Sequence, residues 1–162
     1  GDWSSDVCSS DLPKGPKVIE YNCRFGDPET QVVLPLLDTD LVDIMLAIWN
    51  GTLDQLDIRW KNGCAACVVM ASGGYPKKYV TGLPISGLDE NGQTANCFVY
   101  HAGTKLDDET FLTAGGRVLG VTATAETLPE ALETAYAGVK TISFQDAHYR
   151  KDIGQRALKA LS

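Results

Sequence analysis

Several features are missing from this sequence of 162 residues, and each absence excludes a class of protein. No apolar run approaches the roughly 20 residues that a membrane-spanning helix needs, which excludes such a helix. No basic segment leads into an apolar run, so no signal peptide is expected. The Walker A, GxSxG and HExxH patterns do not occur, so the enzymes defined by those motifs find no support. No repeat of solenoid length is present.

Positive charge is also scarce. Lysine and arginine total 14 residues against 21 aspartates and glutamates, which gives a net charge of −7. The sequence therefore lacks the basic stripe that a nucleic-acid-binding surface needs for its phosphate contacts, and we expect no nucleic-acid partner. A local anion site could still form around Arg24, Arg117 or the Arg150-Lys151 pair.

The cysteines and histidines give no metal or disulfide pattern. Five cysteines are an odd number for a disulfide framework. Cys64-Ala-Ala-Cys67 has redox or zinc-knuckle spacing, but it lies in an apolar run with no second such pair. We expect two buried thiols there, and reduced thiols suit a cytoplasmic protein. His101 and His148 lack metal-ligand spacing to another His or Cys, so we expect both to be structural.

What the sequence does contain is a short predicted strand at residues 17–23 that carries oxygen ligands. Side chains alternate along a strand, so Glu20 and Asn22 point to one side with Cβ atoms roughly 6.5 Å apart. A carboxylate and an amide oxygen suit a hard cation such as Mg²⁺. Arg24 continues on that face and offers a planar fork for phosphate or carboxylate. The alternative is an ordinary solvated strand face.

Two helices are predicted after this strand. Asp27 fits a helix N-cap, with Pro28 at the first helical position, and the helix should run to about residue 37 with Pro35 kinking or ending it. A second helix should start after residues 38–40 and stop at Asn50-Gly51. Its apolar positions follow helical spacing, so we expect this helix to pack in the core.

The rest of the chain reads as mostly β structure. Residues 56–60 and 64–71 are predicted to form an antiparallel pair across a tight turn, followed by a glycine-rich break at 72–76 and a loop to residue 93. Further strands are expected at 96–101, 110–113 and 117–125, then a helix opening at Thr127 and a short one at 155–161. Gly115-Gly116-Arg117 is either an anion nest or a plain hairpin turn.

Five blocks of this sequence resemble, in order, the phosphoribosylamine–glycine ligase (glycinamide ribonucleotide synthetase) family. The first block resembles the end of the family's ATP-grasp module and runs Glu20-Tyr-Asn-Cys-Arg-Phe-Gly-Asp-Pro-Glu-Thr-Gln31. The other four are Ala71-Ser-Gly-Gly-Tyr-Pro76, His101-Ala-Gly-Thr104, Gly115-Gly-Arg-Val-Leu-Gly-Val-Thr122 and Tyr149-Arg-Lys-Asp-Ile-Gly154. The resemblance covers residues 17–162.

The resemblance implies an ATP-dependent carboxylate–amine ligase of purine biosynthesis, with glycine, 5-phosphoribosylamine and ATP as substrates. It implies that Glu20 and Asn22 hold Mg²⁺ or Mn²⁺, and that Arg24 and Asp27 are catalytic. Arg117 and Arg150 are weaker candidates for substrate binding, and they complete the implied set of site residues. The family's ATP-binding lobe and amino-terminal domain would precede residue 17, so the missing part of the enzyme is the expected partner.

The predicted fold class is α+β, divided into three parts. Residues 1–12 match nothing in the family and are expected to be non-native. Residues 13–55 should be the carboxy-terminal end of an ATP-grasp domain, and residues 56–162 a mostly antiparallel, hybrid or barrel-sandwich-like β domain with flanking helices. This piece alone should be inactive. The alternative function is a non-catalytic β-rich interaction module or an inert fragment, and an exposed apolar face is expected where the rest of the module belongs.

Overall fold

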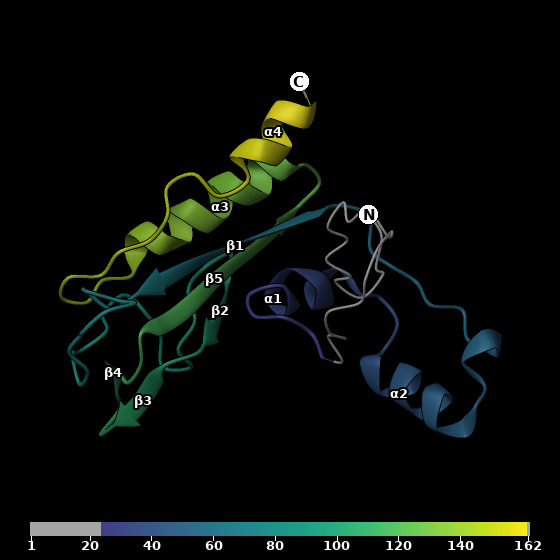
Figure 1. The fold of residues 1–162 in the computed structure, drawn as a ribbon, viewed down its shortest axis with the longest axis horizontal. Helices are drawn as coiled ribbons and strands as arrows, with labels where there is room; N and C mark the ends of the chain where they lie inside the picture. The colour runs from purple at the N-terminus through teal and green to yellow at the C-terminus, as the bar shows by residue number, and fades with distance from the viewer. Residues whose placement is uncertain (1–23, 162) are drawn as a thin grey trace, which may run out of the picture.

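A three-stranded antiparallel sheet forms the centre of the protein, whose computed structural model describes residues 24–161 (Figure 1). The central strand is β5 (Arg117–Ala125), with β1 (Cys64–Ala71) on one side and β2 (Phe98–His101) on the other. The β1–β5 ladder pairs Cys64 with Ala125 and continues to Ala71 opposite Arg117, with a shift in register after Met70. The predicted strands at 64–71 and 117–125 are thus confirmed with their bounds.

The core lies between this sheet and helix α3 (Leu128–Thr141). Ala131, Ala135 and Val139 lie on one stripe of the helix at helical spacing, and all are buried. A Cβ atom on Gly138 would stand 3.2 Å from a methyl group of Val121 on β5, so the helix backbone approaches the sheet closely there. This face of the sheet is therefore buried and tightly packed.

Helix α3 begins where the sequence predicts. The Thr127 hydroxyl accepts a hydrogen bond from the backbone N–H of Glu130, and the Glu130 carboxylate accepts one from the N–H of Thr127. The two bonds form a capping box, and Pro129 occupies an early position where its missing N–H costs nothing. Helix α4 (Gln155–Leu161) follows as predicted, and Gly154 at its start packs against the side chain of Leu132 on α3.

The excursion between β1 and β5 carries the remaining strands. A two-stranded hairpin joins β3 (Thr104–Asp107) to β4 (Thr110–Thr113) and lies beyond the end of β2 (Figure 1). The prediction at 110–113 is confirmed, whereas β3 was not predicted. Residues 77–93 form the expected loop, with isolated bridges at Pro84 and Ser86.

The other face of the sheet is covered in part by α1 (Thr30–Val33) and the 3-10 turn η1 (Leu34–Leu36). A Cβ atom on Gly120, the residue before Val121, would lie 3.9 Å from the Gln31 side chain, so α1 sits opposite α3 (Figure 1). The α-helix ends at Val33 and a 3-10 turn containing Pro35 follows, in keeping with the prediction that Pro35 kinks or ends the helix. The prediction that Asp27 is the N-cap is wrong: the cap position is Glu29, and residues 27–29 form a turn. The predicted strand at 17–23 lies outside the described residues.

Helix α2 (Leu41–Asn50) has the predicted ends but not the predicted environment. The Asp40 carboxylate accepts from the N–H of Val42 at 2.7 Å, and Gly51 ends the helix with φ of 66°. The prediction that this helix packs in the core is wrong, because Ala47 is its only buried residue and Trp49 is 87% exposed. The apolar spacing is real, but within residues 24–161 no layer covers that face. The expected exposed apolar surface is therefore present.

The predicted pairing of residues 56–60 with β1 is also wrong. The 3-10 turn η2 (Leu53–Gln55) precedes this segment. The segment itself forms no strand and makes one bridge, between Trp60 and Leu37. The N–H groups of Asp38 and Thr39 donate to the carbonyl of Arg59 instead. The reason is burial. Strand β1 is apolar on both faces, so its partner must also be buried on both faces, whereas residues 56–60 alternate apolar and charged side chains. No helix in the described part of the chain is long and apolar enough to cross a membrane.

Candidate functional site

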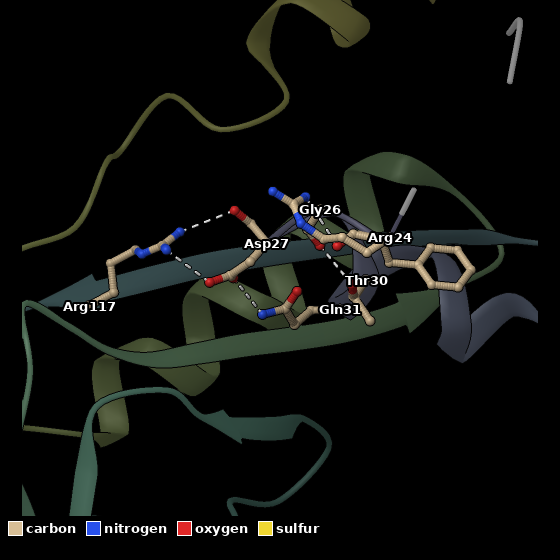
Figure 2. A network of polar contacts seen from close by, with 7 residues as sticks. Arg24, Gly26, Asp27, Thr30, Gln31 and Arg117 are labelled. Carbon is tan, nitrogen blue, oxygen red and sulfur yellow. Dashed lines mark hydrogen bonds and ion pairs between the residues drawn. The ribbon is translucent and has the colours of Figure 1, made fainter. Parts of the chain in front are cut away.

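The candidate site is the loop at residues 24–29, which an arginine from the sheet holds in place (Figure 2). Arg117, the first residue of β5, places one terminal guanidinium nitrogen 3.0 Å from the Asp27 carboxylate. Its other terminal nitrogen donates to the main-chain carbonyl of Asp27 at 3.1 Å. The two residues are 90 positions apart in sequence, so this contact joins the loop to the sheet.

The loop is also held from its own side. The Gln31 amide donates to the second carboxylate oxygen of Asp27 at 2.8 Å, one helical turn further along (Figure 2). The Thr30 hydroxyl and backbone N–H both donate to the carbonyl of Gly26, at 2.6 and 2.9 Å. A Cβ atom on Gly26 would meet the Glu29 carboxylate, which is the end of a flexible, exposed side chain and can turn aside. Both oxygens of Asp27 are thereby engaged.

Arg24 lies at the start of this loop and is exposed. Its guanidinium donates to the neighbouring carbonyl of Phe25 at 3.3 Å, a local contact with an adjacent residue. The side chain is therefore available to an anion that approaches from solvent or from another part of a larger protein. The metal-ligand predictions for Glu20 and Asn22 lie outside the described residues.

Below the loop, the α1 face of the sheet presents polar groups. Cys67 on β1 pairs with Thr122 on β5, and both are buried. Burial raises the pKa of the Cys67 thiol, the Thr122 hydroxyl partly offsets this, and the negative charge of Asp27 adds to it. Burial, together with Cys67, also raises the pKa of Tyr100 on β2. Both groups are consequently neutral near pH 7. The buried thiol expected at 67 is confirmed, whereas the one expected at 64 is only partly buried.

The two glycine-rich turns lie against each other. Ser72 is fully buried, and its hydroxyl and N–H donate to the carbonyls of Gly115 and Gly116, each at 2.8 Å. Gly116 has the Tyr75 ring directly against it, and Gly115 lies close to Gly103. The glycines at 115 and 116 therefore serve close contact between chain segments. Arg117, the third residue of the segment predicted to be either an anion nest or a plain hairpin turn, points to Asp27 (Figure 2).

Arg150 is not brought into this network. Its guanidinium makes a two-pronged contact with Asp152, at 2.9 and 2.8 Å, on an exposed stretch before α4. That contact raises the pKa of Arg150 and lowers the pKa of the Asp152 carboxyl. His101 bonds to Thr104 and to the carbonyl of Gly92, in keeping with the structural role expected for it.

Sequence reasoning missed the two residues that hold the loop from within, Thr30 and Gln31. Gln31 lies four positions after Asp27, the spacing at which side chains meet on a helix, and this signal was in the sequence. Among residues 24–161 no group of three or more His, Cys, Asp or Glu residues is placed to hold a metal ion. The structure thus joins Asp27 with Arg117 and leaves Arg150 with a separate partner.

Comparison with known families gives a match over most of the sheet and α3. Residues 65–156 match the family model described as phosphoribosylglycinamide synthetase, C domain. The solved structure of a phosphoribosylamine–glycine ligase from Thermotoga maritima is similar over 86% of this chain and 34% of that one, with a TM-score of 0.72 and 32% identity. The small α+β fold with antiparallel sheets and helices is therefore that of the corresponding region of this ligase.

Curated relatives agree. A bifunctional purine biosynthetic protein of Dictyostelium discoideum is 52% identical over 97% of this chain and 19% of its own length. A phosphoribosylamine–glycine ligase of a Synechocystis strain is 52% identical over 88% of this chain and 34% of its own length. The chain therefore spans about a third or less of the relatives it matches.

Proposed function

Because the chain belongs to the phosphoribosylglycinamide synthetase family through its C domain, we propose that it is the carboxy-terminal part of an ATP-dependent phosphoribosylamine–glycine ligase. The complete enzyme joins glycine to 5-phosphoribosylamine with ATP, giving glycinamide ribonucleotide, ADP and phosphate, a step of purine biosynthesis. The observation that carries this proposal is the match of residues 65–156 to the family model, together with identities near 50% to full-length ligases.

The activity belongs to the complete enzyme and not to this piece alone. Residues 13–55 would end the ATP-grasp module, and residues 56–162 would form the hybrid β domain that accompanies it. The exposed apolar face of α2 supports a missing layer on that side. The described cysteines are free, which suits a reducing compartment, so we place the enzyme in the cytoplasm.

The chemistry of an ATP-grasp ligase demands neutralisation of charge on the transferring phosphoryl group. A Mg²⁺ or Mn²⁺ ion supplies that charge when it is bound to the ATP phosphates. In this proposal Glu20 and Asn22 hold the ion, because carboxylate and amide oxygens suit hard cations. Within residues 24–161, no group of three or more His, Cys, Asp or Glu residues forms a competing metal site.

The remaining roles fall to residues of the described loop. Arg24 is exposed and would stabilise phosphate or carboxylate charge. Asp27 would help to orient the phosphoribosylamine, although both of its carboxylate oxygens already have partners. Arg117 and Arg150 are weaker candidates for substrate binding, since each guanidinium already holds an aspartate that a substrate would have to share.

The experiment on the metal ligands uses the full-length enzyme that carries this sequence. Glu20→Gln keeps the size of the side chain and removes its charge, so we expect kcat to fall by at least about tenfold with the fold intact. Glu90→Gln is the matched control, because Glu90 is an exposed acid in the loop at 77–93. Wild-type turnover of the Glu20 variant at saturating Mg²⁺ would contradict the metal assignment.

A non-catalytic interaction module or an inert fragment is the second candidate. The observation that favours it is that the chain spans only 19% and 34% of the length of two relatives. Isothermal titration of the 162-residue chain with Mg-ATP separates the cases. We expect no binding, because the missing lobe would supply the nucleotide pocket. Tight binding would show that the pocket lies within this chain and would contradict the fragment interpretation.

A further inference from the structure

Within residues 24–161, the loop at residues 24–29 has one long-range polar side-chain anchor, and that anchor is Arg117. Thr30 and Gln31 bind the loop from within, at separations of four residues. Such local bonds fix the shape of the turn but not its place relative to the sheet. Of the side chains described, Arg117 is the one that makes polar contacts to the loop from across the fold, 90 residues away (Figure 2).

The base of this anchor is rigid. Arg117 begins β5, the central strand, and Val118 and Leu119, which follow it, are fully buried. Opposite Arg117 stands Ala71 at the end of β1, next to the register shift, which places the side chain at the rim of the sheet. A long side chain on a fixed strand can therefore set where the loop lies.

The form of the contact favours positioning over substrate capture. A lone surface ion pair would hold the carboxylate only weakly, since exposed pairs contribute little. Here the guanidinium also donates to the main-chain carbonyl of Asp27, and that bond fixes the backbone itself. Two nitrogens of Arg117 are thus directed at one residue of this chain. The side chain remains about half exposed, at 42%.

We propose that Arg117 is a positioning residue of the ligase, which acts through Asp27. By holding the backbone and the carboxylate of Asp27 together, it fixes the loop on the sheet and so aims the Arg24 guanidinium three residues earlier. The inference rests on the proposed function for its catalytic consequence. Its structural half, the ordering of the loop by Arg117, concerns this chain alone and is tested without any activity.

The first experiment measures backbone amide order parameters of this chain by NMR. In the native protein the amides of the loop at residues 24–29, except Pro28, which has none, should be ordered, near 0.85, and in Arg117→Ala they should fall below about 0.6, while β1 and β5 keep their values. Lys105→Ala is the control, because it removes an exposed cation that pairs with a nearby aspartate at 3.4 Å. Should Arg117→Ala unfold the chain, Arg117→Lys is measured in its place, because lysine keeps the charge without the fork. An ordered loop in the substituted protein would overturn the inference.

The second experiment measures kinetics of the full-length enzyme. A positioning role predicts that Arg117→Ala lowers kcat by about tenfold or more while each substrate KM changes by less than about threefold. A direct substrate contact would instead raise the KM of one anionic substrate, and that result would overturn the inference. Arg117→Lys should recover part of the lost kcat, and Lys105→Ala should behave as the native enzyme.

A double-mutant cycle tests whether Arg117 acts through Asp27. Asp27→Ala combined with Arg117→Ala should lower kcat no further, within about twofold, than the more damaging single change. If the kcat of the double variant falls by the product of the two single losses, the two residues act independently, and that result would overturn the inference. Failure of the proposed function looks different: the native full-length enzyme would show no glycine-dependent release of ADP, while the NMR result could still stand.

Discussion

The ring of Tyr75 lies against the backbone of Gly116, so closely that a Cβ atom on this glycine would overlap the ring. The two residues belong to the two glycine-rich turns that follow β1 and precede β5. Ser72 joins the same turns through hydrogen bonds to the carbonyls of Gly115 and Gly116. These turns are therefore built for contact between chain segments, and the requirement for glycine at 116 is steric.

Gly116→Ala should destabilise the protein through that overlap. The added methyl group would force Tyr75 or the turn to shift, at a cost of about 1–3 kcal/mol in the free energy of unfolding. Gly115→Ala is the matched control and should cost less, because its Cβ atom would meet its nearest neighbour at 3.1 Å, where a small adjustment suffices. Urea unfolding of the three proteins measures both effects.

Removing the ring should relieve the Gly116→Ala variant. Tyr75→Ala combined with Gly116→Ala should lose less free energy of unfolding than the sum of the two single losses, because the clash needs both groups. A strictly additive result in the same urea experiment would mean that the ring does not cause the loss.

The capping box of α3 predicts a cost for Thr127→Ala. The substitution removes the acceptor for the N–H of Glu130, and we expect a loss of about 1 kcal/mol in the free energy of unfolding. Thr127→Ser keeps the hydroxyl and should retain most of the stability. Equal stability of the alanine and serine variants in thermal or urea unfolding would contradict the role of this cap.

The buried Cys67 thiol predicts a loss of stability at alkaline pH. Its folded pKa is raised, chiefly by burial, so the folded state holds its proton more tightly than the unfolded chain. The stability from this group is complete below the unfolded thiol pKa, about 8.5, and is lost as pH rises through the raised folded pKa. Cys67→Ala should therefore lose less free energy of unfolding than the native chain over that alkaline range. Parallel pH profiles of the two proteins would contradict this.

The exposed face of α2 predicts that the isolated chain associates with itself. Trp49 is 87% exposed and Ile48 is 59% exposed, and such a patch favours contact with another apolar surface. We expect binding of a hydrophobic dye and a concentration-dependent elution volume in size-exclusion chromatography. Ile48→Ser with Trp49→Ser should reduce both, whereas Val80→Ser, at an exposed valine in a loop, should not. A dye-free monomer at all concentrations would count against this expectation.

Local signals in the sequence predicted many of the elements and some of their contacts. The caps at Asp40 and Thr127 and the stop at Gly51 were readable because each depends on neighbours within a few residues. Strand pairing was not readable, because it depends on which segments can bury both faces. Residues 56–60 follow the right period for a strand, yet their charged side chains suit an exposed segment, and β5 takes the central position beside β1.

The site was predictable in its residue types but not in its contacts. Asp27 and Arg117 were both singled out as candidates, while their pairing across 90 residues was not, since no local pattern encodes a long-range ion pair. Asp27 was expected to cap a helix. In the structure its carboxylate binds Arg117 and Gln31 instead, and the helix begins two residues later, with Glu29 at the cap position. A tertiary contact has displaced a local preference there.

The hydrogen bond from the N–H of Ser72 to the carbonyl of Gly116 joins the two ends of the long segment that connects β1 to β5. Because this bond holds the two ends of that segment together, the exposed stretch at residues 77–81 can gain or lose residues at a modest entropic penalty, since closure depends only weakly on length. Grafting a foreign peptide into that stretch would leave the register of the two long strands untouched. The architecture thus separates a constant frame from a segment that is free to diversify.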